Sequence, residues 1–293
     1  MEMMRTEEEM MRMIRDTARK DDRIRAAYLE GSRANPNVPK DMFQDYDVVY
    51  VVEETESFQR EKDWIDRFGK RLYMQYPEDR ETPEEKAQCY GWLMQFADGN
   101  RMDLHVCTKE YARSHLELYR VLVDKDGIFE EKEMLSDERY RVQRPDQEEF
   151  SAVCNEFWWC LNNVAKGMWR REIPYVMEML DMIIRPMLRT ILEWKIGVET
   201  EFSVSAGKSG KYMEQYLDED TYSRYLETYT SAGISDIQTG VEEMCRLFHE
   251  TALYVSGKLD LTYNLEEAKN SREYLEDILS LPLDAETILL RKK

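Results

Sequence analysis

Histidine, cysteine, glycine and proline are all scarce in this chain of 293 residues. Three His leave little for a histidine-based metal site, and five Cys without a Cys-x-x-Cys pair indicate neither a thiolate zinc site nor a disulfide framework. Twelve Gly and eight Pro, beside 42% hydrophobic and 11% aromatic residues, exclude a disordered chain. The composition is that of a folded globule, and the length favours two domains or one large one.

Long apolar runs and basic residues are also lacking. No stretch approaches 18 apolar residues and the first 25 residues are crowded with charges, so we expect a cytoplasmic protein without a membrane span or secretory signal. Sixty Asp and Glu against 41 Lys and Arg give a net charge of −19, which argues against nucleic acid as a partner. The surplus acid either keeps the protein soluble or attracts a cation, and composition leaves both interpretations open.

Helical and strand patterns alternate in the first half of the chain. We expect a helix with one apolar face over residues 7–20 and a charged helix near 57–70. Short apolar runs predict strands at 24–29 and 46–52. The second run is continuously β-branched and aromatic, which is typical of a strand buried on both faces.

A β-hairpin follows. Asp98-Gly99-Asn100 separates the runs 91–97 and 101–107, and Asp-Gly between two such runs favours a tight turn. Along the second run, apolar residues alternate with Arg101, Asp103 and His105. Because the apolar set faces the core, we expect Asp103 on the open face of the sheet.

The second half is helical. Apolar spacing predicts helices at 150–168, at 173–197 with an interruption at Arg185-Pro186, and at 237–255. Charged residues and Pro145 separate the two halves, and we divide the chain into domains 1–140 and 141–293.

Two acids at the start of the predicted buried strand are the candidate catalytic residues. Asp45 and Asp47 are alternate residues, so their carboxylates project to one side, about 6 to 7 Å apart along the backbone. Such a pair, with Asp103 as a third acid, can hold Mg²⁺ against the phosphates of a nucleotide. An isolated D-x-D is more often a solvated turn, and it is the combination with the preceding turn that points to a site.

That turn is Gly31-Ser32, thirteen residues before the acid pair. Gly31 lets the backbone approach a triphosphate, Ser32 offers a hydroxyl and an N–H at a helix start, and Arg33 adds positive charge. The combination predicts phosphoryl or nucleotidyl transfer.

Gly-Ser followed by D-x-D is the signature of the DNA polymerase beta-like nucleotidyltransferase superfamily. The longer motifs resemble one branch of it, the aminoglycoside 6-adenylyltransferases, over most of the chain. The residues that carry this resemblance are Leu29 to Pro39, Phe43 to Asp47, Asp98 to Leu104, Asn155 to Trp158, Lys166 to Glu172, Ile184 to Pro186, Gly207-Lys208 and Lys211 to Met213.

The resemblance implies an α+β protein, in which a nucleotidyltransferase domain with a mixed β-sheet flanked by helices precedes a C-terminal α-helical bundle. It also implies transfer of AMP from ATP, as co-substrate, to the 6-hydroxyl of streptomycin, a cationic aminoglycoside. Asp45 and Asp47 would hold Mg²⁺, and Asp103 would be the general base or a third metal ligand. The oligomeric state is left open.

Three lysines of the second half are candidates for phosphate contacts. Lys166 shares a polar stripe of its helix with Asn155 and Asn162, and periodicity alone fits a solvated lysine equally well. Gly207-Lys208-Ser209 is not a P-loop, because that motif needs a glycine at position 202, which is Phe. We interpret it as a flexible connection before a helix at 212–217, with Lys208 and Lys211 near the triphosphate.

Two other functions remain open. A nucleotidyltransferase of the same chemistry that modifies a protein or an RNA end would need a different acceptor site, and for RNA a basic groove that the sequence does not suggest. A catalytically silent nucleotide-binding protein would be indicated by loss of one of the three acids, and all three are present.

Overall fold

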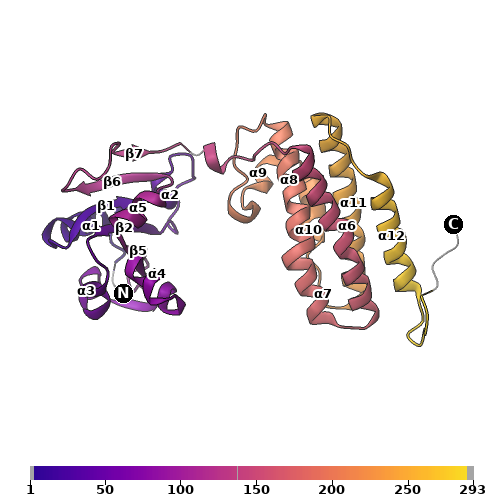
Figure 1. The fold of residues 1–293 in the computed structure, drawn as a ribbon, viewed down its shortest axis with the longest axis horizontal. Coiled ribbons are helices and arrows are strands. Elements are labelled where there is room, and N and C mark those ends of the chain that lie inside the picture. Colours follow the sequence, from indigo (N-terminus) through magenta and orange to yellow (C-terminus); the bar gives the residue numbers. More distant parts are fainter. Residues whose placement is uncertain (1–2, 137, 289–293) are drawn as a thin grey trace. The chain divides into compact units, whose positions relative to one another are not determined.

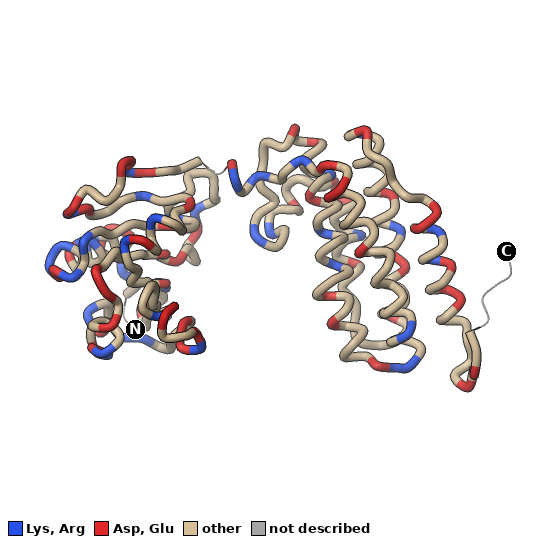
Figure 2. Tube along the Cα trace, viewed as in Figure 1, with Lys and Arg blue, Asp and Glu red and all other residues tan. Residues whose placement is uncertain are grey.

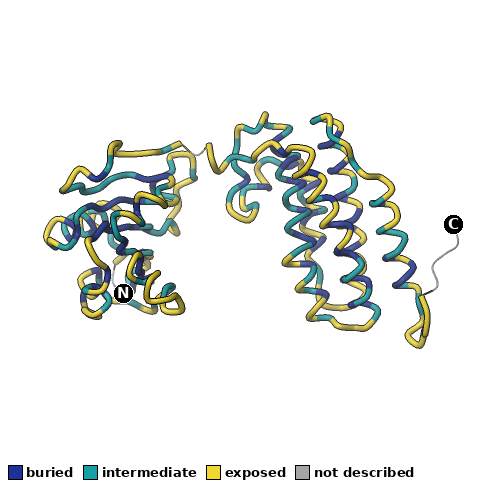
Figure 3. The backbone as a smooth tube through the Cα atoms, in the orientation of Figure 1, coloured by how far each residue is buried: buried dark blue, intermediate teal, exposed yellow. Residues whose placement is uncertain are grey.

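The computed structural model describes residues 3–136 and 138–288, and the chain divides into two compact units (Figure 1). Unit 1 is Met1–Asp137 and unit 2 is Glu138–Lys293, so the division lies close to the domain boundary expected from the sequence. Each unit has buried positions of its own along its strands or on the inner faces of its helices (Figure 3). The chain is thus an α+β protein whose sheet belongs entirely to unit 1.

A mixed seven-stranded sheet forms the centre of unit 1, with the order β3-β4-β5-β2-β1-β6-β7. Strands β2 and β5 are parallel, and the other neighbouring pairs are antiparallel. The strands are β1 (Ile24–Leu29), β2 (Tyr46–Val52), β3 (Arg71–Gln75), β4 (Cys89–Phe96), β5 (Arg101–Thr108), β6 (Tyr119–Asp124) and β7 (Glu133–Met134). The predicted strands at 24–29 and 46–52 and the predicted hairpin are confirmed.

The two faces of this sheet pack differently. One face carries the larger core, where helix α1 (Glu7–Lys20) packs and the Tyr50 hydroxyl donates to the Ile14 carbonyl at 2.9 Å. The opposite face has only a small apolar cluster near helix α5 (Lys109–Ser114). Residues 47, 103 and 105 belong to this second face, because their neighbours on β2 and β5 are buried in the larger core. A polar area therefore remains beside the small cluster.

The helices of unit 1 have clear local causes. Thr6 and Glu9 form a capping box that begins α1, and Arg19 and Lys20 lie in its last turn. The single charged helix expected near 57–70 is wrong, since this region forms the short helix α3 (Glu56–Arg60) and the 3₁₀ helix η1 (Trp64–Phe68). The break between them lets the aromatic rings of Phe58 and Trp64 meet edge to face in the larger core.

The remaining short helices of unit 1 are α2 (Gly31–Ala34), η2 (Pro77–Arg80) and α4 (Pro83–Gln88), and the 3₁₀ helix η3 (Glu138–Tyr140) lies at the start of unit 2. The first two of these bring polar residues to the sheet face that the large core leaves open.

Unit 2 is built from helices packed around one core. The predicted helices at 150–168 and 237–255 are confirmed within the longer α6 and α11. The predicted interruption before Pro186 is also confirmed, because the π-helical turn η4 precedes the proline, which has no N–H to donate. The elements are α6 (Gln147–Trp169), α7 (Ile173–Met179), η4 (Leu180–Ile184), α8 (Arg185–Glu199), η5 (Lys208–Gly210), α9 (Met213–Tyr216), α10 (Glu219–Glu227), α11 (Ile234–Leu259) and α12 (Leu265–Ser280).

The acidic surplus is shared almost equally between the two units, and acidic residues are spread along most of their helices and loops (Figure 2). None of the helices in the described residues is long and apolar enough to span a membrane.

Candidate active site

Three carboxylates meet on the open face of the unit 1 sheet. Asp45 and Asp47 lie at the start of β2, and Asp103 lies on β5, directly beside Asp47 in the parallel register. One carboxylate oxygen from each acid can be chosen so that the three lie within 4.8 Å of one another, and all three residues are half-buried. The structure thus brings together the three acids that the sequence singled out, and the arrangement suits a divalent cation.

Several charged side chains surround Asp47. Burial raises the pKa of Asp47 to about 6, and the nearby charges of Asp45 and Asp103 act in the same direction. Arg101 opposes this effect: its guanidinium donates to both oxygens of Asp103, at 2.9 and 2.6 Å, and lies 3.8 Å from Asp45. Without another cation, the three acids therefore share one arginine.

Gly31 lies against the Asp47 carboxylate. Its φ of +63° belongs to the left-handed region, and a Cβ at this position would be 2.0 Å from an Asp47 carboxylate oxygen. The N–H of the preceding residue, Glu30, donates to the Asp47 carbonyl at 3.0 Å. The Gly-Ser turn thus packs directly against the acid pair, and only glycine fits at position 31.

Ser32 follows in α2, and its hydroxyl is buried without a hydrogen-bond partner among the described residues. A buried hydroxyl of this kind has a cost unless something accepts or donates to it. A phosphate oxygen of a bound nucleotide would supply that partner, so the turn fits a triphosphate as the three acids fit Mg²⁺.

Arg33 is turned toward its own loop. Its guanidinium donates to the carbonyls of Asp45 and Gln44, at 2.9 and 2.8 Å, and stacks on the ring of Tyr46 at 3.9 Å. These contacts hold the segment that carries Asp45. The expected phosphate contact of Arg33 stays a prediction, and in this structure the side chain positions the acid pair.

Glu30, Glu78 and His105 border the three acids on the same face. The alternation along the strand predicted this face for His105, whereas sequence reasoning assigned no role to Glu30 or Glu78. Burial and the charge of Asp47 raise the pKa of Glu30 to about 7. His105 lies 3.4 Å from Glu78, which also accepts the N–H of Gly91 at 2.8 Å, and there is room for the imidazole only because residue 91 lacks a Cβ. Glu78 comes from the separate helix η2, and no local pattern in the sequence connects it with the strand that carries His105.

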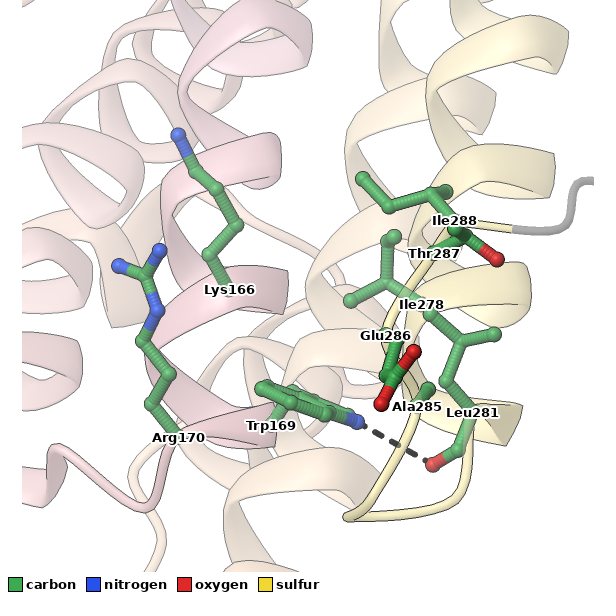
Figure 4. A pocket seen from close by; sticks show the side chains of 9 residues that line it. All are labelled: Lys166, Trp169, Arg170, Ile278, Leu281, Ala285, Glu286, Thr287 and Ile288. Atoms are coloured by element: carbon green, nitrogen blue, oxygen red, sulfur yellow. Dashed lines mark hydrogen bonds between the residues drawn. The ribbon is translucent and has the colours of Figure 1, made fainter.

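The three candidate lysines belong to unit 2. Lys166 lies on α6 beside Arg170, and with Trp169 they line one side of a pocket completed by α12 and residues 281–288 (Figure 4). The Trp169 indole N–H donates to the Leu281 carbonyl at 3.2 Å across this pocket. The other residues that line the pocket are mainly apolar and include the Glu286 carboxylate, so the phosphate contact of Lys166 stays a prediction.

Lys208 and Lys211 are exposed on the turn that contains η5. Gly207, Ser209 and Gly210 all have positive φ, and the Lys211 ammonium lies 5.0 Å from the centre of the Tyr212 ring. The helix that follows, α9, is shorter than the helix expected at 212–217. Their phosphate contacts stay predictions.

The sheet, the Gly-Ser turn and three acids on adjoining strands are those of a nucleotidyltransferase. The model of the streptomycin adenylyltransferase family matches residues 4–278. The chain belongs to this family.

Two aminoglycoside 6-adenylyltransferases agree with this membership in sequence. An aminoglycoside 6-adenylyltransferase of Bacillus subtilis (strain 168) is 37% identical over 265 residues, which covers 89% of this chain and 93% of the relative. One from Campylobacter jejuni is 35% identical over 271 residues, covering 92% and 94%. The crystal structure of an aminoglycoside 6-adenyltransferase from Bacillus subtilis aligns at 32% identity with a TM-score of 0.48, covering 95% of this chain and all of that one.

Proposed function

We propose that this enzyme transfers AMP from ATP to the 6-hydroxyl of streptomycin, by Mg²⁺-assisted in-line displacement with release of pyrophosphate, and so confers resistance. The observation that carries the proposal is the meeting of Asp45, Asp47 and Asp103 beside a glycine that touches one of them. The names of the relatives support an aminoglycoside as the acceptor.

The three acids would have two roles, metal binding and proton transfer. Asp45 and Asp47 would hold Mg²⁺, which when bound neutralises the triphosphate and stabilises the attacking and leaving oxygens. Asp103 would accept the proton of the sugar hydroxyl, a contribution of roughly 10²- to 10⁴-fold to the rate. Arg101 donates to both carboxylate oxygens of Asp103 and so holds the orientation of this side chain.

The alternative role of Asp103, as a third metal ligand, gives a different result in one measurement. A titration of an Asp103→Asn variant with Mn²⁺, in the absence of nucleotide, separates the base from the metal ligand. Unchanged Mn²⁺ affinity together with lost turnover identifies a base. A loss of affinity as large as that of Asp45→Asn identifies a ligand instead.

The phosphates of the nucleotide are the proposed ligand of the Gly-Ser turn and of four cationic side chains. Gly31 and Ser32 would lie against the phosphates, and the unpartnered Ser32 hydroxyl supports this. Arg33, Lys166, Lys208 and Lys211 are the proposed sources of positive charge. Loss of any one lysine should raise the KM for ATP more than it lowers kcat. A charge contact that is present both in the enzyme–ATP complex and in the transition state stabilises the two equally.

The acceptor is a polycation with two guanidinium groups, and acidic residues should recognise it. Glu30 and Glu78 lie on the same face as the three catalytic acids, and both are partly buried. They support a local role for part of the acidic surplus, although that surplus as a whole is spread over both units.

The test is pyrophosphate release from ATP and Mg²⁺ over a panel of aminoglycosides. We expect release with streptomycin, and none from Asp45→Asn or Asp47→Asn variants that keep the wild-type circular dichroism spectrum. ATP binding without release on any aminoglycoside would refute the acceptor assignment. Modification of an RNA end or a protein under the same conditions would favour the alternative acceptors, and no transfer at all would favour a silent binding protein.

A further inference from the structure

Two cysteines face each other within the unit 1 sheet. Cys89 begins β4 and Cys107 lies directly opposite it on the antiparallel strand β5. Opposite Cα atoms in such a pair are about 4.5 to 5.5 Å apart, inside the range of about 4.4 to 6.8 Å that a disulfide spans. Their sulfur atoms are 2.6 Å apart as free thiols, so a bond between them needs no rearrangement of the strands.

This pair is on the same sheet face as the catalytic acids. Cys107 lies two residues beyond His105 on β5, and Cys89 follows directly after α4. Both side chains belong to the small apolar cluster beside the polar site. Cys89 retains 9% of its surface exposed and Cys107 3%, so a small reagent reaches Cys89 first.

The two thiols are not equivalent. Contact with Cys107 lowers the pKa of Cys89, burial opposes this, and the charge of His105 adds to the lowering. The same contact and burial raise the pKa of Cys107. Cys89 is thus the more nucleophilic thiol, because the thiolate is the reactive form.

The three other cysteines have a different environment. Cys154, Cys160 and Cys245 lie in the helical unit, where burial raises their pKa values to about 12, 11 and 12. No sulfur–sulfur contact joins any of them within the described residues. They provide internal controls for reactivity.

We propose that Cys89 and Cys107 are a redox modification site that forms a reversible disulfide under a peroxide oxidant. The Cys89 thiolate attacks one peroxide oxygen, the O–O bond breaks, and the released hydroxide takes up a proton to become water. The Cys107 sulfur then attacks the resulting sulfenic acid, the S–O bond breaks, and the Cys107 proton leaves with the hydroxide as a second water. Two thiols lose two electrons and one peroxide is reduced.

The bond ties the first residue of β4 to the interior strand β5. The disulfide would close the β4–β5 hairpin covalently. It would also fix the C-terminal end of α4, because Cys89 follows directly after Gln88. Because the cross-link restricts the unfolded chain, we expect the melting temperature to rise by a few degrees on oxidation and to return on addition of a thiol reductant.

The experiment treats the purified full chain with a small excess of hydrogen peroxide, removes the peroxide with catalase, and alkylates free thiols under denaturing conditions. We expect alkylated thiols to fall from five to three, with an intact mass lower by two hydrogen atoms before labelling. Trypsin should release residues 87–101 joined to residues 102–109, and dithiothreitol should separate them.

Serine variants check the assignment. Cys89→Ser and Cys107→Ser should each lack the joined peptide, whereas Cys154→Ser and Cys245→Ser should keep it. The joined peptide is measured in the wild-type chain, so a variant that fails to fold does not affect the main result. Five free thiols after peroxide, sulfinic acid on Cys89 as the main product, or a joined peptide involving another cysteine would each overturn the proposal.

Discussion

Arg101 and Asp103 lie two residues apart on the same face of β5, and the guanidinium of the first donates to both carboxylate oxygens of the second. The same guanidinium lies 3.8 Å from Asp45. Arg101 therefore neutralises part of the charge of two acids in the proposed metal site, and a divalent cation at that site has to share or replace these contacts.

Replacement of Arg101 by Gln should destabilise the metal-free protein. The three acids then lose their arginine, and because Arg101 is half exposed we expect a loss on the order of 1 kcal/mol. Thermal unfolding with EDTA and with saturating Mg²⁺ measures it, and Mg²⁺ should recover most of the loss. Arg12→Gln, which removes an exposed ion pair on α1, is the matched control and should unfold like wild type under both conditions.

An equal loss for Arg101→Gln with and without Mg²⁺ would mean that Arg101 stabilises the strand and not the acids. Arg101→Lys keeps the charge and loses the two-pronged geometry, so it should fall between wild type and Gln.

Replacement of Gly31 by Ala should abolish most activity. The new Cβ would lie 2.0 Å from an Asp47 oxygen, so the carboxylate or the turn has to move, and we expect kcat/KM to fall by about 100-fold or more. Gly127 has the same φ of +63°, but a Cβ added there would meet nothing within 4 Å. Gly127→Ala therefore carries the same backbone cost, roughly 1 kcal/mol or more, without the collision.

Steady-state adenylyl transfer and thermal unfolding of both glycine variants separate the two effects. A lower melting temperature in both variants, with activity lost only in Gly31→Ala, is the expected pattern. Full activity in Gly31→Ala would show that the turn and Asp47 are not coupled.

The stability of the metal-free protein should fall as the pH rises through about 6. Asp47 has an ordinary pKa of 3.8 that burial raises to about 6, so the folded state holds a proton that the unfolded state has released. The stability that this proton contributes is fully present below pH 3.8 and is lost as the pH rises through the folded-state pKa of about 6. Asp47→Asn should flatten this part of the profile and should melt above wild type at about pH 7.5 in EDTA.

Melting temperatures between about pH 4.5 and 7.5, measured in EDTA and in Mg²⁺, check the sign. Mg²⁺ should weaken the wild-type pH dependence, because a bound cation favours the ionised acid. A wild-type melting temperature that rises steadily over this range without metal, with Asp47→Asn no more stable, would contradict the assignment.

Replacement of Arg185 by Met should destabilise unit 2 by about 2 to 4 kcal/mol. Arg185 is 4% exposed, donates to the Thr228 carbonyl at 3.2 Å and stacks on Tyr229 at 3.7 Å. Its loss leaves the buried polar groups of Thr228 without their donor. Chemical denaturation measures the effect, and Arg170→Met, at an exposed arginine, should cost less than about 1 kcal/mol. Equal losses in the two variants would exclude this role.

The sequence was sufficient for the features that depend on local periodicity. The alternation along β5 placed Asp103 on the open face, and the Asp-Gly turn predicted its hairpin. The pairing of β2 with β5 was not predictable in this way, because a parallel neighbour is chosen by the whole sheet and leaves no local pattern. The three acids were therefore identified as a set before their contact was known.

The expectations that were wrong or incomplete also depend on contacts between distant parts of the chain. The charged region near 57–70 has enough polar residues for one helix, but Phe58 and Trp64 are both drawn into the core and the chain breaks between them. Glu78 was missed because it approaches His105 from another part of the chain. Arg33 was interpreted by its charge alone, whereas its direction depends on the carbonyls of residues 44 and 45.

The parallel pairing of β2 and β5 also bears on how the enzyme folds. Asp47 and Asp103 become neighbours only after the intervening chain, which includes β3 and β4, has closed on itself. Contacts of this sequence separation form slowly, because loop closure costs entropy before any pairing is gained. Asp103 reaches Asp45 and Asp47 only when this pairing has formed, so the return of adenylyl transfer during refolding would mark the moment at which the central sheet is complete.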